Sequence, residues 1–168
     1  MQEVSINKEA KLSPHFTLGE MTKTSTKTAD GNIPSHVHIE NLKRLCVSWL
    51  EPLRYLYNTR YCLAPGEDYD ESRNVEPIII NSGYRSEAVN KAIGGVAGSN
   101  HLTGCAVDIH VDEIKQAMRY AVILLDESDE NHLDFDELLI ERSPKGTYWL
   151  HFAVRPSGNR RKVRFIQT

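Results

Sequence analysis

Three short segments of the chain carry side chains that could hold a metal ion and hydrolyse a bond. They are Ser82-Gly-Tyr-Arg-Ser86, the stretch from Ser99 to His110, and Tyr148-Trp-Leu-His151. A catalytic zinc ion usually takes three ligands from His, Asp or Glu side chains and keeps a fourth position for water. His101, Asp108 and His151 would supply such a set, so the residue types indicate a hydrolytic zinc site.

Alternation along two predicted strands directs two of these side chains away from the core. In a strand over residues 105–111, Asp108 lies on the face opposite the apolar side chains, because successive residues of a strand point to opposite faces. In a strand over residues 147–154, the same holds for His151. Both groups can therefore reach a common centre outside the core.

The remaining histidines of the motif are placed by a glycine and by the same alternation. Gly104 can turn the chain upstream of the strand, so that His101, seven positions before Asp108, returns to the same centre. His110 shares a face with Asp108 and stays an alternative, either as a ligand or as a group that supports one.

The general base is expected on the strand that precedes His151. Residues 135–141 and 147–154 read as a β-hairpin joined through a Pro-Lys-Gly turn. If the strands pair about a centre near 145 to 146, Glu141 lies opposite residue 149 or 151 and shares the face of His151. Such a turn does not fix the register, so Glu137, further along that face, is the alternative base.

Taken in order, the motifs Ser-Gly-Tyr-Arg-Ser, Ser-x-His-x-x-Gly-x-Ala-x-Asp-Ile and Trp-x-His resemble the D-alanyl-D-alanine carboxypeptidase-like zinc peptidases. That family includes phage peptidoglycan endopeptidases and is similar in its core to the Hedgehog N-terminal domain and lysostaphin-type enzymes. The resemblance runs from about Ser13 to about Arg160. It implies one zinc ion per chain, held by His101, Asp108 and His151, and a peptide of peptidoglycan as the substrate.

The resemblance also assigns roles around the metal, with one departure from the family pattern. It implies that Arg85 binds or polarises the substrate and that Ser99 contacts it. Many relatives carry an acidic residue three positions before the last histidine ligand, where this chain has Tyr148. Glu141 is therefore the expected base, and a non-catalytic, zinc-containing binding or phage structural module is the alternative function.

Composition limits the class of protein. The chain has 168 residues, a formal charge of −3 and 40% hydrophobic residues, which fits one soluble domain that acts as a monomer. The weakly acidic balance argues against nucleic acid as a partner, and no apolar run is long enough to insert into a membrane. No signal peptide is visible, so we expect synthesis in the cytoplasm and action on the cell wall, for example after release by a phage lysis system.

The pattern of elements predicts an α+β fold with helices packed on a small, mostly antiparallel sheet. Residues 1–12 are expected to be a flexible N-terminus and residues 13–168 a single zinc peptidase domain. The expected elements are a helix capped by Ser35 and disturbed at Pro52, a buried strand over 75–81, a short helix over 87–93, a helix over 112–125, the hairpin, and an edge strand over 162–167.

Three surface segments are predicted outside these elements. The loops over residues 22–34 and 64–74 are expected to close the groove and decide which peptide bond is cut, as carboxypeptidase or endopeptidase. The basic run from Asn159 to Lys162 is expected to be solvated, with contact to an anionic wall polymer as the functional alternative.

Overall fold

The computed structural model describes residues 6–73 and 75–168. Five strands form one sheet in the order β1-β2-β4-β3-β5, in which every neighbouring pair is antiparallel except β3 and β5. The strands are β1 (Ile80–Ser82), β2 (Ala106–His110), β3 (Glu137–Arg142), β4 (Tyr148–Ala153) and β5 (Lys162–Gln167). The predicted α+β class with a mostly antiparallel sheet is confirmed.

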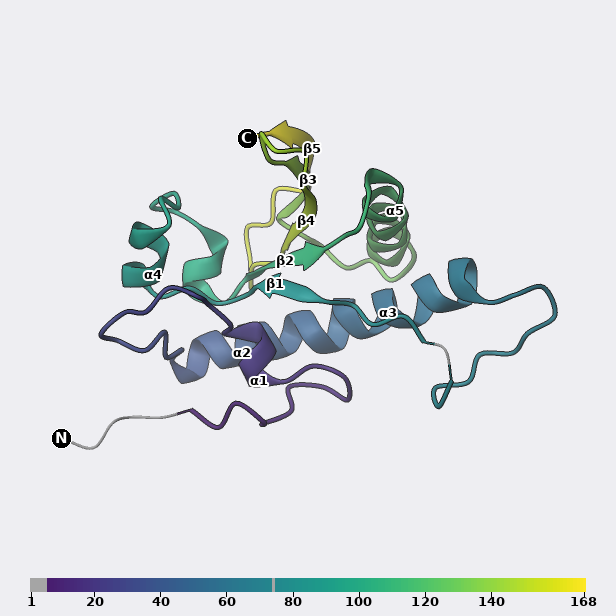
Figure 1. Cartoon of the computed structure of the whole chain (residues 1–168), viewed down its shortest axis with the longest axis horizontal. Helices are drawn as coiled ribbons and strands as arrows, with labels where there is room; N and C mark the ends of the chain where they lie inside the picture. Colours follow the sequence, from purple (N-terminus) through teal and green to yellow (C-terminus); the bar gives the residue numbers. More distant parts are fainter. Residues whose placement is uncertain (1–5, 74) are drawn as a thin grey trace.

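The long helix and α5 cover the apolar face of this sheet, and the other face carries a groove. Figure 1 shows α5 on one side of the sheet and α4 on the other, with the long helix of α2 and α3 running past both. The helices are α1 (Leu18–Met21), α2 (His36–Leu45), α3 (Glu51–Tyr57), α4 (Glu87–Ala92), α5 (Ile114–Glu130) and the short 3-10 helix η3 (Asn100–Thr103).

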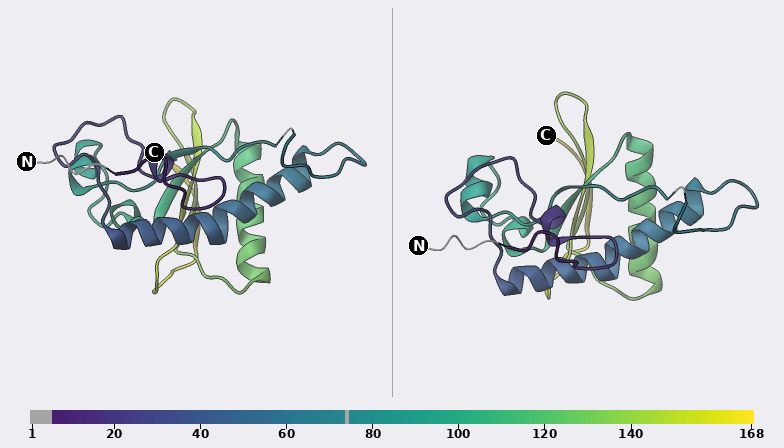
Figure 2. Two further views of the ribbon diagram at one scale, coloured as in Figure 1. Left: turned by 90° about the horizontal axis from the view of Figure 1, so that it is seen from below. Right: turned by 60° about the horizontal axis from the view of Figure 1, so that its bottom comes forward.

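The long helix is continuous through two π-helical turns, η1 (Cys46–Leu50) and η2 (Asn58–Cys62). Ser35 caps it, as predicted, by accepting a hydrogen bond from the backbone of His38. Pro52 is the second residue of α3 and lies two positions after the end of η1, where its missing N–H does not interrupt the helix. Figure 2 shows that the helix bends but does not end there.

The core lies between this long helix, α5 and the apolar face of the sheet. Strand alternation places Val107, Ile109, Leu150 and Phe152 on that face, and all four are fully buried. Trp49 of the long helix packs edge-on against Phe152, with ring centroids 4.9 Å apart. The opposite face is therefore free to carry polar side chains.

The first strand differs from the prediction. Only Ile80–Ser82 pair as a strand, at the edge of the sheet, and within the run of isoleucines Ile78 and Ile80 are buried while Ile79 is 47% exposed. An edge strand with one face on the core alternates in this way, whereas the run of β-branched residues alone suggested burial on both faces.

Residues 6–12, which were expected to belong to a flexible N-terminus, pack on the domain. Leu12 is buried, and the carbonyls of Lys8 and Ala10 accept hydrogen bonds from the backbone of Gly19 and Leu18. Residues 1–5 lie outside the described residues. Among the described residues, no helix combines the length and apolar character needed to cross a membrane.

Candidate active site

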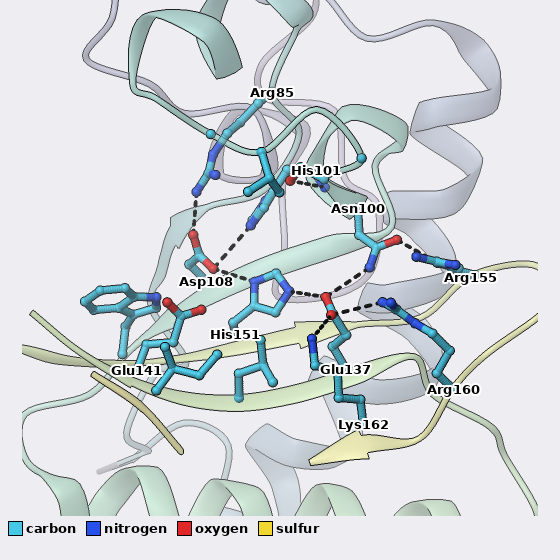
Figure 3. A pocket seen from close by; sticks show the side chains of 17 residues that line it. Arg85, Asn100, His101, Asp108, Glu137, Glu141, His151, Arg155, Arg160 and Lys162 are labelled. Carbon is cyan, nitrogen blue, oxygen red and sulfur yellow. Dashed lines mark hydrogen bonds and ion pairs between the residues drawn. The ribbon is translucent and has the colours of Figure 1, made fainter. Parts of the chain in front are cut away.

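The three predicted ligands meet on the open face of the sheet. His101 comes from η3, Asp108 from β2 and His151 from β4, where Asp108 and His151 are directly paired across the two strands. The ligand atoms of all three residues lie within 4.8 Å of one another, and all three residues are buried (Figure 3). Asp108 Oδ1 lies 3.2 Å from His101 Nε2 and 2.9 Å from His151 Nδ1.

These separations fit a tetrahedral zinc ion. Zinc bonds of about 2.0 to 2.2 Å place two ligand atoms of a tetrahedron roughly 3.4 Å apart. Two imidazole nitrogens and one carboxylate oxygen form a donor set that zinc favours, and three protein ligands leave a fourth position for water. His101, Asp108 and His151 could therefore hold a catalytic zinc ion.

Each histidine has a hydrogen-bond partner on its other ring nitrogen. His101 Nδ1 lies 2.6 Å from the carbonyl oxygen of Gly83, and His151 Nε2 lies 3.4 Å from Glu137 Oε2. An oxygen at that position accepts from an N–H, so it favours the tautomer whose free lone pair faces Asp108. With a metal ion bound, the two histidines would therefore present their unprotonated nitrogens to the same centre.

Two glycines make these positions possible. Gly104 ends η3 in the left-handed region with φ of 69°, and a Cβ there would lie 2.5 Å from the carbonyl oxygen of His38. A Cβ on Gly83 would lie 2.3 Å from the carbonyl oxygen of Met21, so only glycine brings that backbone close enough. The predicted turn at Gly104 is confirmed.

The ionisable groups of the cluster shift one another's pKa values. Burial raises the pKa of Asp108, but attraction and hydrogen bonds from His101 and His151 outweigh burial and hold it well below its usual range. Burial lowers the pKa of His151, but the carboxylates of Asp108 and Glu137 raise it to about 9. The site therefore stabilises positive charge at its centre, as a cation site must.

Glu141 and Glu137 lie on the same face of β3 in different surroundings. Glu141 pairs with Trp149 across the hairpin, which is one of the two registers expected, and it lines the groove. Burial raises the pKa of Glu141, and its carboxylate makes no hydrogen bond or ion pair with another described residue. A hydrogen bond from His151 leads the effects that lower the pKa of Glu137 to about 2.

Arg85 and Ser99 also line the groove. The Arg85 guanidinium donates to Asp108 Oδ2 at 2.5 Å and to Ser82 Oγ at 2.9 Å, so it lies beside the metal position. Ser99 caps η3 by accepting from the backbone N–H of His101 at 3.3 Å. Ser99 thus supports the helix that carries His101 as well as lining the groove.

His110 lies away from the cluster. Its Nε2 lies 3.1 Å from Asp112 Oδ1, and its side chain is 41% exposed. It shares the face of Asp108, as alternation requires, but sits two residues further along the strand and is not among the three clustered ligands. The alternative of His110 as a ligand is therefore not supported.

The groove has a volume of about 510 Å³, and neither loop expected to close it contributes a lining residue from the described part of the chain. Residues 64–73 follow the far end of the long helix, where His15 and Arg54 pair with Glu71 at 2.8 Å and 2.7 Å. The described residues of both loops do not meet the expectation that they close the groove, because the turn after α4 and the segments around β3, β4 and β5 form its walls.

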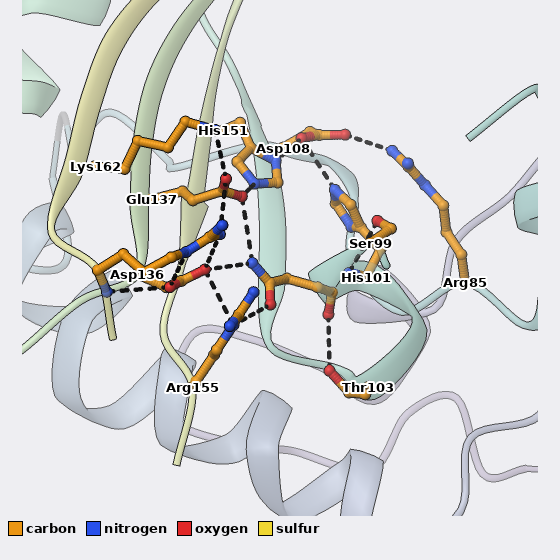
Figure 4. Close-up of polar contacts among 12 residues, drawn as sticks. Arg85, Ser99, His101, Thr103, Asp108, Asp136, Glu137, His151, Arg155 and Lys162 are labelled. Atoms are coloured by element: carbon orange, nitrogen blue, oxygen red, sulfur yellow. Dashed lines mark hydrogen bonds and ion pairs between the residues drawn. The ribbon is translucent and has the colours of Figure 1, made fainter. Parts of the chain in front are cut away.

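Sequence reasoning missed a buried polar network next to the metal position (Figure 4). Asp136 is fully buried and accepts hydrogen bonds from Asn100 at 2.8 Å and from Arg160 at 2.7 Å. Asn100 Nδ2 also lies 3.3 Å from Glu137 Oε2. The network joins η3, which holds His101, to β3. Only strand alternation, which places Glu137 on the site face, gave a signal for it.

Residues 14–127 match the family model described as Peptidase M15. The chain belongs to the M15 peptidase family. This is the family of D-Ala-D-Ala carboxypeptidase-like zinc peptidases that the motifs resemble, and its members depend on zinc. The match contains Arg85, Ser99, His101 and Asp108. His151 lies beyond the match, and the Trp-x-His motif together with the geometry of the cluster joins it to the other ligands. Comparison with curated proteins gave no match.

Proposed function

We propose that this chain is a zinc peptidase that hydrolyses peptide bonds in the stem peptides of peptidoglycan. The observation that carries the proposal is the buried His101, Asp108 and His151 cluster with an unpaired carboxylate, Glu141, in the same groove. Membership of a zinc peptidase family supports the reaction class, and the resemblance to D-Ala-D-Ala carboxypeptidases supports the substrate.

The mechanism follows from what each side chain can do. A bound zinc ion supplies a Lewis acid and lowers the pKa of its water. Glu141 accepts the proton of the attacking water and transfers it to the leaving amine, a role suited to a carboxylate whose pKa is raised by burial. Arg85 donates N–H groups to the carbonyl oxygen as negative charge develops there. No covalent intermediate is required.

The other expected properties are part of the same proposal. The enzyme works as a monomer on cell-wall peptides, as a carboxypeptidase or as an endolysin-type endopeptidase. Groove residues lie on both sides of His151, with Glu141 on one side and Arg155 and Lys162 on the other, so we infer that a peptide extends on both sides of the metal position.

Replacing Glu141 tests the proposed base. Glu141→Gln keeps the size of the side chain but cannot accept a proton, so kcat on muropeptides is expected to fall at least ~100-fold while about one zinc ion per chain stays bound. Glu130→Gln, at an exposed position on α5, serves as the matched control with unchanged activity. Mass spectrometry of digested muropeptides measures the activity and identifies the bond.

Two results would contradict the proposal. Unchanged activity in Glu141→Gln removes Glu141 as the base. A folded wild-type protein that binds zinc but cleaves no muropeptide favours the non-catalytic module, and removal of zinc by a chelator should abolish any cleavage that is observed.

A further inference from the structure

Three cationic side chains gather at one end of the groove. Arg155, Arg160 and Lys162 line it on the Glu137 side of His151, whereas Arg85 and Glu141 lie on the other side (Figures 3 and 4). Arg160 and Lys162 belong to the basic run that the sequence suggested was solvated. Arg161, which lies between them in the sequence, does not line the groove and instead forms an ion pair of 2.8 Å with Asp129.

Two carboxylates beneath these cations hold them in place. Asp136 lies 2.7 Å from the Arg160 guanidinium and 3.1 Å from Arg155 Nε. Glu137 Oε1 lies 3.0 Å from Arg160 and 3.1 Å from Lys162 Nζ. Three cations thus face two carboxylates, so this end of the groove keeps a net positive charge in a protein whose overall charge is −3.

The cations also keep unused hydrogen-bond donors. Arg155 uses only its Nε in side-chain hydrogen bonds with described residues, and the Nη1 of Arg160 makes none. Lys162 donates to Glu137 alone. Their side chains are 33%, 48% and 31% exposed, so the free N–H groups point to the groove or to solvent.

The lining of the same groove includes three small, non-ionic residues from the turn after α4, which are Gly95, Val96 and Gly98. A Cβ on Gly98 would meet nothing within 4 Å. This part of the lining therefore adds neither a large side chain nor a competing carboxylate.

We propose that Arg155, Arg160 and Lys162 form a subsite for a carboxylate of the peptide substrate, away from the bond that is cut. The planar forks of two arginines suit a carboxylate, and charge-assisted hydrogen bonds are stronger than neutral ones. The inference rests on the proposed peptidase function and deepens it. The preferred substrate is an acidic peptide, selected at a distance from Arg85.

A panel of paired peptides tests the subsite. In a stem pentapeptide, each carboxylate is made in turn a free acid or a primary amide, and kcat/KM is measured for both forms. At one position, kcat/KM of the wild-type enzyme is expected to be about tenfold higher for the acid than for the amide. This factor corresponds to the lower end of the range for a hydrogen bond to a charged group. The preference should shrink as salt is raised, because the cations are partly exposed.

Two variants locate the preference. Lys162→Met and Arg155→Gln are each expected to reduce the ratio of acid to amide severalfold. The ratio of acid to amide rates is measured because each variant also disturbs neighbouring side chains. Loss of Lys162 disturbs Glu137, and loss of Arg155 disturbs Asn100 and one of the ion pairs of Asp136, which lowers both rates together. Lys43→Met, at an exposed position on α2, is the matched control that keeps the wild-type ratio. Arg160 is left intact because it holds the buried Asp136.

The outcomes separate this inference from the proposed function. Cleavage of acid and amide forms at equal rates at every position overturns the subsite and leaves the peptidase standing. If no peptide is cleaved, the peptidase proposal fails, and calorimetric binding of the same pairs still tests the subsite. Tighter binding of an acid form, lost in Lys162→Met, supports it, and equal binding of both forms overturns it.

Discussion

Two glutamates on one face of β3 are expected to perform different tasks because their neighbours differ. Glu137 is bound by His151, Arg160 and Lys162, which keeps it ionised and fixes its oxygens. Glu141 has no such partners, and burial makes its carboxylate easier to protonate. A carboxylate held by cations can orient a ligand, whereas an unpaired one can exchange protons.

The orienting role of Glu137 can be measured through zinc affinity. Glu137→Ala removes the acceptor beside His151 Nε2 and is expected to weaken zinc binding about 10- to 100-fold. Glu137→Gln keeps an oxygen acceptor, so its zinc affinity should lie between those of the wild type and Glu137→Ala. Competition with a chromophoric chelator gives the affinities, with Glu130→Ala as the control. Equal affinity in all four proteins would show that Glu137 does not support the metal ligand.

Among the elements, the hairpin of β3 and β4 and the short helix η3 decide where the site lies. The hairpin was predictable in its strands and faces, because alternation showed which side chains leave the core. The register of the hairpin could not be predicted, because no motif specifies the turn that sets it. In the structure Glu141 pairs with Trp149. The network around Asp136 was also hidden, because its members come from three separate segments.

Gly104 allows a test of how η3 carries His101. Gly104→Ala must tolerate a left-handed φ and a Cβ 2.5 Å from the carbonyl oxygen of His38. We expect a loss of about 2 to 4 kcal/mol in the free energy of unfolding, together with weaker zinc binding. Gly66→Ala, with φ of 80° and nothing within 4 Å, should lose only about 1 kcal/mol.

Chemical denaturation and zinc titration give both quantities for the two variants. A Gly104→Ala protein no less stable than Gly66→Ala would contradict the close approach of η3 to α2. Normal zinc binding in a destabilised Gly104→Ala protein would show instead that η3 contributes stability without placing the ligand.

At the scale of the whole molecule, the N-terminal segment belongs to the domain. Leu12 joins the core cluster, and His15 lies 2.7 Å from Glu51 of α3 and 2.8 Å from Glu71. The segment therefore links the long helix to the loop that follows it. The polar composition of residues 1–12 suggested a flexible end, because a few apolar residues at irregular spacing give no periodic signal.

Replacing Leu12 tests whether this segment supports the fold. Leu12 is 6% exposed, so Leu12→Ala is expected to lower the free energy of unfolding by about 2 to 4 kcal/mol. Glu9→Ala, at an exposed position in the same segment, should change it by less than about 0.5 kcal/mol. Urea denaturation gives both values, and equal stability of the two variants would place the segment outside the cooperative unit.

The π-helical turn η1 marks the place where the long helix can change its length. A π turn absorbs one extra residue, so deleting one residue within Cys46–Leu50 would restore a regular α-helix and keep α2 and α3 in register. Deleting one residue from α3 instead would rotate α2 by about 100° relative to the residues that follow the deletion. That rotation would carry Asn41 away from the carbonyl oxygen of Thr103, which it now reaches at 2.8 Å, and would separate η3, with His101, from its support on α2.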